Sequence, residues 1–158
     1  MTRFADLADA GRRLAPLVVA AGLDDPVLLA IIPNGVPVAE PIADELGATI
    51  IGVVLDRAGE PRVTELPDIA GRAVVVVDDG VETGTAARLV GQAARAGHVA
   101  SLVLAVPVCP REAQASLDAA YDQIIAIERP LVRRDLRWHY DDLDGIDEAE
   151  ARRRLVDR

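Results

Sequence analysis

The chain has 158 residues, of which 51% are hydrophobic, and a formal net charge of −9 at pH 7. This length allows a core that buries about two-thirds of the unfolded surface, and we expect a single domain over residues 1–158. The hydrophobic content excludes a disordered chain, and the negative charge argues against a general nucleic-acid or anionic-membrane surface. No apolar run is long enough to span a membrane, the start lacks the apolar core of a signal peptide, and one cysteine provides no disulfide framework. We therefore expect a cytoplasmic protein.

Short apolar runs alternate with amphipathic stretches along the chain. The runs fit strands buried on both faces, and they cover residues 27–32, 49–55, 74–77, 99–106 and 123–127. The amphipathic stretches predict helices over residues 3–20, 36–46, 83–97, 110–120 and 147–156. Residues 56–71 form a polar connection with at most a short strand near 62–65, and residues 129–145 look irregular. The alternation predicts an α/β fold with a doubly wound, mainly parallel, five-stranded sheet and flanking helices.

The first predicted helix carries apolar residues at helical spacing. This spacing predicts that they face the core: Phe4, Leu7, Ala8, Leu14, Leu17 and Val18. Gly47 is expected to close the second helix at its C-terminus.

The stretch from Arg72 to Gly97 carries the residues best suited to chemistry. Its valine run ends at Asp78 and Asp79, and a helix begins shortly afterwards. The free N–H groups and positive dipole end of a helix attract a phosphate, while carboxylates at a strand tip accept hydrogen bonds from sugar hydroxyls. Because ligands of parallel sheets bind at this end of the strands, the pattern favours a sugar-phosphate site. The alternative is a plain turn capped by Thr83, with both acids in solvent.

This segment resembles the phosphoribosyl pyrophosphate motif of the type I phosphoribosyltransferases. In that motif an apolar strand and two acids precede three mixed positions and then Thr or Ser, Gly, any residue and Thr; the last position is Ala86 here. The resemblance implies that Asp78 and Asp79 hold the ribose hydroxyls and stabilise positive charge on the sugar ring. Mg²⁺ would reach these two carboxylates only indirectly, through the bound substrate. The resemblance also implies a cradle for the 5′-phosphate, formed by Thr83, Gly84, Thr85, Ala86 and Ala87.

A second stretch, IIPNGVPVA at residues 31–39, lies where the family carries its pyrophosphate loop. Relatives read Pro-Arg-Gly-Gly-Val-Pro-Val-Ala there, which implies that Pro33, Asn34 and Gly35 face the leaving pyrophosphate. Aligned through Gly35, the family's arginine becomes Pro33 and its first glycine becomes Asn34. Asparagine tolerates a left-handed backbone, so the turn is expected to survive, but a cation for pyrophosphate is lost. A plain strand-to-helix turn is the alternative.

The tail carries a third similarity, from Trp138 to Leu143 and on through the final helix, so the resemblance spans roughly residues 27–155. Trp138 is the only tryptophan, and it would either stack on a nucleobase or plug the edge of the core. Glu82 occupies the position where purine-using relatives carry an aspartate near the incoming base. It would act as a general base or orient the purine, or it would simply suit the helix dipole.

The hood and the mobile loop that close over the site in these enzymes are reduced here, because only residues 56–71 are available for the loop. The chain contains no lysine, so Arg57 and Arg62 are the candidates for a loop cation. The resemblance therefore implies a pared-down protein that binds phosphoribosyl pyrophosphate or a nucleotide, with Mg²⁺-dependent transfer of ribose 5-phosphate to a nucleobase as its reaction. A non-catalytic regulator that binds the same ligands is the alternative. We expect a small-molecule ligand, no nucleic acid and no membrane. The oligomeric state stays open, with a homodimer as one alternative because members of the family often pair.

Overall fold

A computed structural model describes residues 3–158. Its centre is a sheet of five parallel strands in the order β2-β1-β5-β6-β7. The strands are β1 (Val27–Ile31), β2 (Ile50–Val53), β5 (Ala73–Val77), β6 (Ser101–Val108) and β7 (Gln123–Glu128). The expected parallel five-stranded sheet is confirmed.

The strand order places a topological switch point between β1 and β5. The chain winds from β1 outwards to β2, and later from β5 outwards in the opposite direction to β7. The crossovers leaving β1 and β5 therefore diverge, which opens a crevice at the carboxyl ends of these two strands. Both sequence stretches that resemble ligand-binding loops follow these two strands.

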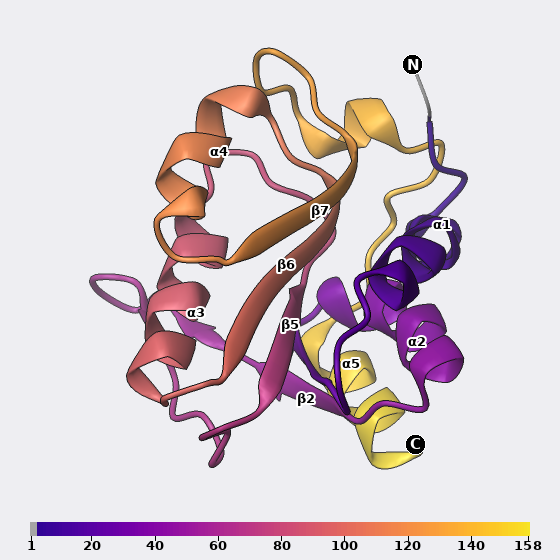
Figure 1. Cartoon of the computed structure of the whole chain (residues 1–158). Helices are drawn as coiled ribbons and strands as arrows, with labels where there is room; N and C mark the ends of the chain where they lie inside the picture. Colours follow the sequence, from indigo (N-terminus) through magenta and orange to yellow (C-terminus); the bar gives the residue numbers. More distant parts are fainter. Residues whose placement is uncertain (1–2) are drawn as a thin grey trace.

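Helices cover both faces of the sheet (Figure 1). One face carries α1 (Leu7–Ala20), α2 (Gly35–Leu46) and α5 (Glu148–Val156), and the other carries α3 (Thr85–Ala96) and α4 (Arg111–Asp118). Side chains of β5 alternate between the two cores: Val75 and Val77 pack with α1 and α2, while Val74 and Val76 pack with α3 and α4. This burial on both sides explains the uninterrupted valine run.

Two small elements complete the fold. The expected strand at 49–55 is split, because Val54 interrupts it and β3 (Leu55–Asp56) pairs instead with β4 (Arg62–Val63) in an antiparallel hairpin. The irregular segment contains a short 3₁₀ helix, η1 (Leu136–His139). Gly47 closes α2 in the left-handed conformation, as expected, with φ of 62°. No helix within residues 3–158 has the length and apolarity needed to cross a membrane.

The start of α1 corrects the sequence prediction. Residues 3–6 are not helical, because Asp6 is an extended N-cap whose carboxylate accepts a hydrogen bond from the Asp9 N–H at 2.7 Å. Phe4 is buried as expected, but it lies in an extended segment that pairs with Tyr140. Leu17 was expected to face the core and is 44% exposed, because the buried stripe of α1 is narrower than the apolar pattern suggests.

Candidate functional site

A cavity of about 160 Å³ lies at the carboxyl end of β5. Most of its wall comes from the loop after the strand and from the first turn of α3. We call this cavity the phosphate cleft, and its walls are formed by Arg57, Asp78, Gly80, Val81, Glu82, Thr83, Gly84, Thr85, Ala86, Ala87 and Leu136. All five residues of the expected phosphate cradle therefore line one cleft, together with Asp78 and Glu82.

The start of α3 presents free backbone donors to this cleft. Gly84 is the N-cap in a left-handed conformation, with φ of 88°, and it has no side chain to cap the helix. The N–H of Arg88 is the first to bond back, to the Gly84 carbonyl at 2.9 Å, so the donors before it have no partner within the helix. The Thr83 hydroxyl accepts a long bond of 3.4 Å from the Thr85 N–H, and it shares a hydrogen bond of 3.2 Å with the Thr85 hydroxyl, in which either oxygen could donate. This geometry suits an anion rather than a helix capped by Thr83.

The two acids at the tip of β5 are partly buried and are held by different partners. Asp78 accepts a hydrogen bond from the Asp79 N–H at 2.8 Å, and Asp79 accepts one from the Asn34 side-chain amide at 3.1 Å. Neither acid takes part in the ion pairs found among residues 3–158. The carboxylates are therefore not neutralised by arginine.

Burial raises the pKa of the Asp78 carboxyl well above its usual range, and the charge of Asp79 raises it further. Burial also raises the pKa of Asp79, although the hydrogen bond from Asn34 opposes this shift. Two adjacent acids that are costly to ionise gain most from a ligand that supplies hydroxyl donors or a cation.

The turn after β1 lies against these acids. Asn34 is right-handed, with φ of −74° and ψ of −18°, so the left-handed turn that we considered is not formed. Its side-chain oxygen accepts a hydrogen bond from the Ile146 N–H at 3.2 Å, so the amide bridges Asp79 and the segment before α5. Gly35 is required at the next position because an added Cβ would lie 2.6 Å from the Val77 carbonyl oxygen. Asn34 contacts Asp79 and Gly35 lies against Val77, but none of Pro33, Asn34 and Gly35 lines the phosphate cleft.

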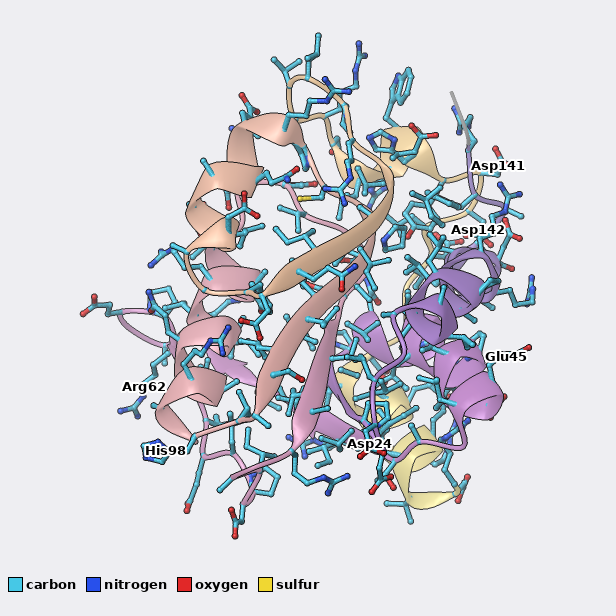
Figure 2. All side chains as sticks on the ribbon, viewed as in Figure 1. Asp24, Glu45, Arg62, His98, Asp141 and Asp142 are labelled. Carbon is cyan, nitrogen blue, oxygen red and sulfur yellow. The ribbon has the colours of Figure 1, made fainter. Side chains whose placement is uncertain are left out.

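The two candidate cations lie in different places. Arg57 lines the phosphate cleft, and its charge lowers the pKa of Asp78. Arg62 approaches Asp56 at 3.5 Å, and its side chain is 79% exposed. Figure 2 shows Arg62 at the outer margin of the molecule. Only Arg57 is brought to the site.

Segment 133–138, which includes most of η1, supplies residues that sequence reasoning missed. Leu136 lines the phosphate cleft, and its backbone N–H donates to the Glu82 carboxylate at 3.0 Å. Trp138 does not plug the core, because it is 40% exposed and carries the Arg134 guanidinium 4.5 Å above its ring. Trp138 also does not line the cleft.

Tyr140 is a second missed residue. It is buried, and its hydroxyl donates to the Asp79 backbone carbonyl at 2.7 Å. Burial raises the pKa of this phenol, so it remains a neutral donor. Asp79 is thus held through its side chain by Asn34 and through its backbone by Tyr140.

The acidic side chains of the cleft do not form a metal site by themselves. Residues 3–158 contain no group of three or more His, Cys, Asp or Glu side chains that could hold a metal ion. Mg²⁺ is usually bound by one or two carboxylates together with phosphate oxygens of a substrate. Asp78 and Asp79 fit this second arrangement.

Two curated relatives, from Mycobacterium tuberculosis strains CDC 1551 and H37Rv, are each named "Putative phosphoribosyl transferase" and are 26% identical over 182 aligned positions. The alignment covers 82% of this chain but only 41% of theirs, so the chain spans about two-fifths of their length.

Solved structures share the fold. The protein TT1426 of Thermus thermophilus superposes with a TM-score of 0.88 at 23% identity, over 99% of both chains. A hypoxanthine-guanine phosphoribosyltransferase of Bacillus anthracis superposes with a TM-score of 0.62 at 16% identity, over 90% of this chain and 92% of its own. The family model described as "Phosphoribosyl transferase domain" matches residues 4–128. With most of its length inside that match, the chain belongs to the phosphoribosyl transferase domain family.

Proposed function

We propose that this protein binds phosphoribosyl pyrophosphate and transfers its ribose 5-phosphate group to a ring nitrogen of a nucleobase. The observation that carries the proposal is one cleft in which free helix-start N–H groups lie beside a carboxylate unpaired with any arginine. This juxtaposition matches a ligand with a phosphate at one end and a hydroxyl-rich ring next to it.

In the proposed reaction, the nitrogen forms a bond to C1 of the ribose while the bond from C1 to the pyrophosphate oxygen breaks. Pyrophosphate leaves with the bonding electron pair, and the proton of the nitrogen passes to solvent. The first turn of α3 holds the 5′-phosphate and thereby fixes the sugar. Asp78 and Asp79 accept hydrogen bonds from the two ribose hydroxyls, and their negative charge stabilises the positive charge that develops on the ring. Mg²⁺ bound to the substrate would lie near Asp78 and Asp79, and it would supply positive charge to the leaving pyrophosphate.

A specific observation keeps a second function open. The turn after β1 contains no cation, and the Asn34 amide is already bound to Asp79 and Ile146. The loop that could cover the reacting centre is reduced to the β3–β4 hairpin. The second candidate is therefore a regulator that binds phosphoribosyl pyrophosphate or a nucleotide without catalysing transfer.

One experiment separates the two functions. The protein is titrated with phosphoribosyl pyrophosphate in excess Mg²⁺, and pyrophosphate release is then followed over a panel of nucleobases. Release that depends on one base supports the transferase, whereas binding without release supports the regulator. A double variant, Asp78→Asn with Asp79→Asn, is the control. Equal or absent binding in the wild type and this variant would contradict both functions.

A further inference from the structure

Segment 133–138 is held against the phosphate cleft by two carboxylates from different parts of the chain. Glu82, just before α3, accepts a hydrogen bond from the Leu136 N–H at 3.0 Å. Glu112, in the first turn of α4, accepts one from the Arg133 N–H at 2.7 Å. Both bonds fix the backbone of the segment, so they act whatever side chains the segment carries.

The bond to Glu82 is the one that bears on the cleft. It places Leu136, which is only 9% exposed, as part of the cleft wall. The Leu136 side chain fills the space beside Gly80, where an added Cβ would meet its Cδ2 at 2.5 Å. The loop after β5 and the segment are therefore fitted to each other at this point.

The same segment is tied to the loop after β5 a second time. Tyr140, shortly after the segment, donates to the Asp79 carbonyl. The stretch from Asp79 to Glu82 is thus bound at both of its ends to residues 136–140. Loss of the Glu82 contact would leave only the Tyr140 contact between the two stretches. Leu136 would then no longer be held in the wall of the cleft.

From these contacts we propose that Glu82 is a positioning residue that holds segment 133–138 against the phosphate cleft. One of its carboxylate oxygens accepts a backbone N–H, as a structural acceptor does, and the variants below test whether the carboxylate also takes a proton from a nucleobase. This inference rests on the proposed function for the identity of the ligand. The attachment itself is a property of the unliganded protein and is tested separately.

Two substitutions at the same position separate the roles. Glu82→Gln keeps an oxygen that accepts the Leu136 N–H but cannot act as a base. Glu82→Ala removes both capacities. Trp138, the only tryptophan, lies two residues after Leu136 and reports on the segment through its emission and anisotropy. Glu45→Ala is the matched control, because Glu45 is an exposed carboxylate on α2, away from the cleft (Figure 2).

We expect Glu82→Ala to lower the Trp138 anisotropy in the unliganded protein and to weaken binding of Mg²⁺–phosphoribosyl pyrophosphate by about tenfold. Glu82→Gln should restore both signals to near the wild-type values, and the pH profile of any transfer activity should keep its shape. Glu45→Ala should change neither signal. Glu112→Ala removes the other contact, which holds the Arg133 N–H. It should lower the Trp138 anisotropy without a matching loss of affinity for Mg²⁺–phosphoribosyl pyrophosphate.

Two results would overturn the proposal. Unchanged Trp138 anisotropy in Glu82→Ala would show that the carboxylate holds nothing. Loss of turnover in Glu82→Gln by about a hundredfold, with normal binding and anisotropy, would assign Glu82 to proton transfer. If the wild type itself does not bind phosphoribosyl pyrophosphate, the proposed function fails, while the anisotropy of the two variants still decides whether Glu82 holds the segment.

Discussion

Two strand-to-helix turns lie side by side at the switch point of the sheet, and they differ in whether their polar groups are free or already hydrogen-bonded. After β5, Gly84 starts α3 with a positive φ and leaves its first N–H groups facing the phosphate cleft. After β1, Asn34 starts α2 in a right-handed conformation, with its amide engaged by Asp79 and Ile146. The first, which we call the open turn, leaves donors facing the cleft. The second, which we call the closed turn, holds the Asp79 side chain in place.

The difference shows that a helix start is not a binding site by topology alone. Both turns lie at the carboxyl ends of adjacent parallel strands, where the fold favours ligands. The turn after β1 nevertheless does not line the phosphate cleft, and its Gly35 packs so closely on β5 that an added Cβ would meet the Val77 carbonyl oxygen.

This close packing yields the largest expected effect. Gly35→Ala should destabilise the protein by about 3 kcal/mol, because the neighbouring group is backbone of the central strand and cannot move aside. Denaturant unfolding measures the change. Gly59→Ala is the control, since nothing lies within 4 Å of its added Cβ, and it should stay within about 0.5 kcal/mol of the wild type. Equal stability of the two variants would mean that the backbone at Gly35 is not tightly packed against β5.

The next effect tests whether Asn34 holds Asp79. Asn34→Asp replaces a donor with a second carboxylate, and it should destabilise the protein by about 2 kcal/mol at neutral pH through charge repulsion and an unmade hydrogen bond. Acidification protonates one of the two acids, so much of this loss should disappear below about pH 5. Asn34→Ala is the control, because it removes the hydrogen bonds without adding charge, and its loss should be smaller and should change less with pH than that of Asn34→Asp. A pH-independent loss in Asn34→Asp would contradict the assignment.

The sequence predicted the open turn better than the closed one, for a physical reason. The valine run, the paired acids and the small residues of the first α3 turn are all consecutive, so local pattern describes the whole cradle. The contacts of Asn34 with Ile146, of Tyr140 with Asp79 and of Leu136 with Glu82 join residues 112, 61 and 54 positions apart. No periodicity encodes such pairs.

The same distinction explains the errors at α1 and Trp138. The helical spacing of Phe4 and Leu7 led the sequence prediction to start the helix too early, although Asp6 is a good N-cap. In the structure Phe4 pairs with Tyr140 and is therefore extended. Trp138 is large and apolar, but its neighbours His139 and Tyr140 are the buried ones. Which member of a short irregular segment faces inwards depends on the partner surface, and that surface is formed by distant residues.

The third prediction concerns the acids at the open turn. The folded-state pKa of Asp78 is raised above its unfolded value of 3.8, so the folded protein binds more protons than the unfolded chain as the pH rises from about 4 towards the folded pKa. Stability is therefore lost across this window. Asp78→Asn removes the buried charge but keeps the oxygen that accepts the Asp79 N–H.

We expect Asp78→Asn to be more stable than the wild type by about 1.5 kcal/mol at pH 7, because the variant no longer buries an ionised carboxylate. The difference should vanish near pH 4, where the wild-type acid approaches protonation in both states. Unfolding curves at several pH values measure it, and binding of phosphoribosyl pyrophosphate should be weakened in the same variant. A variant that is less stable at neutral pH would show that Asp78 contributes to the fold rather than to the ligand.

The smallest expected effect tests the cation at the open turn. Arg57 lines the phosphate cleft, whereas Arg62, from the same hairpin, points to solvent beside Asp56. Arg57→Ala should weaken binding of ribose 5-phosphate by about fivefold, because an exposed guanidinium contributes a modest, screened attraction. The loss should shrink as salt is added, since salt already weakens the wild-type attraction. Arg62→Ala removes the same charge from the same hairpin and should leave affinity unchanged. If both variants lose affinity equally, the effect comes from net charge, and the cleft gains nothing from the position of Arg57.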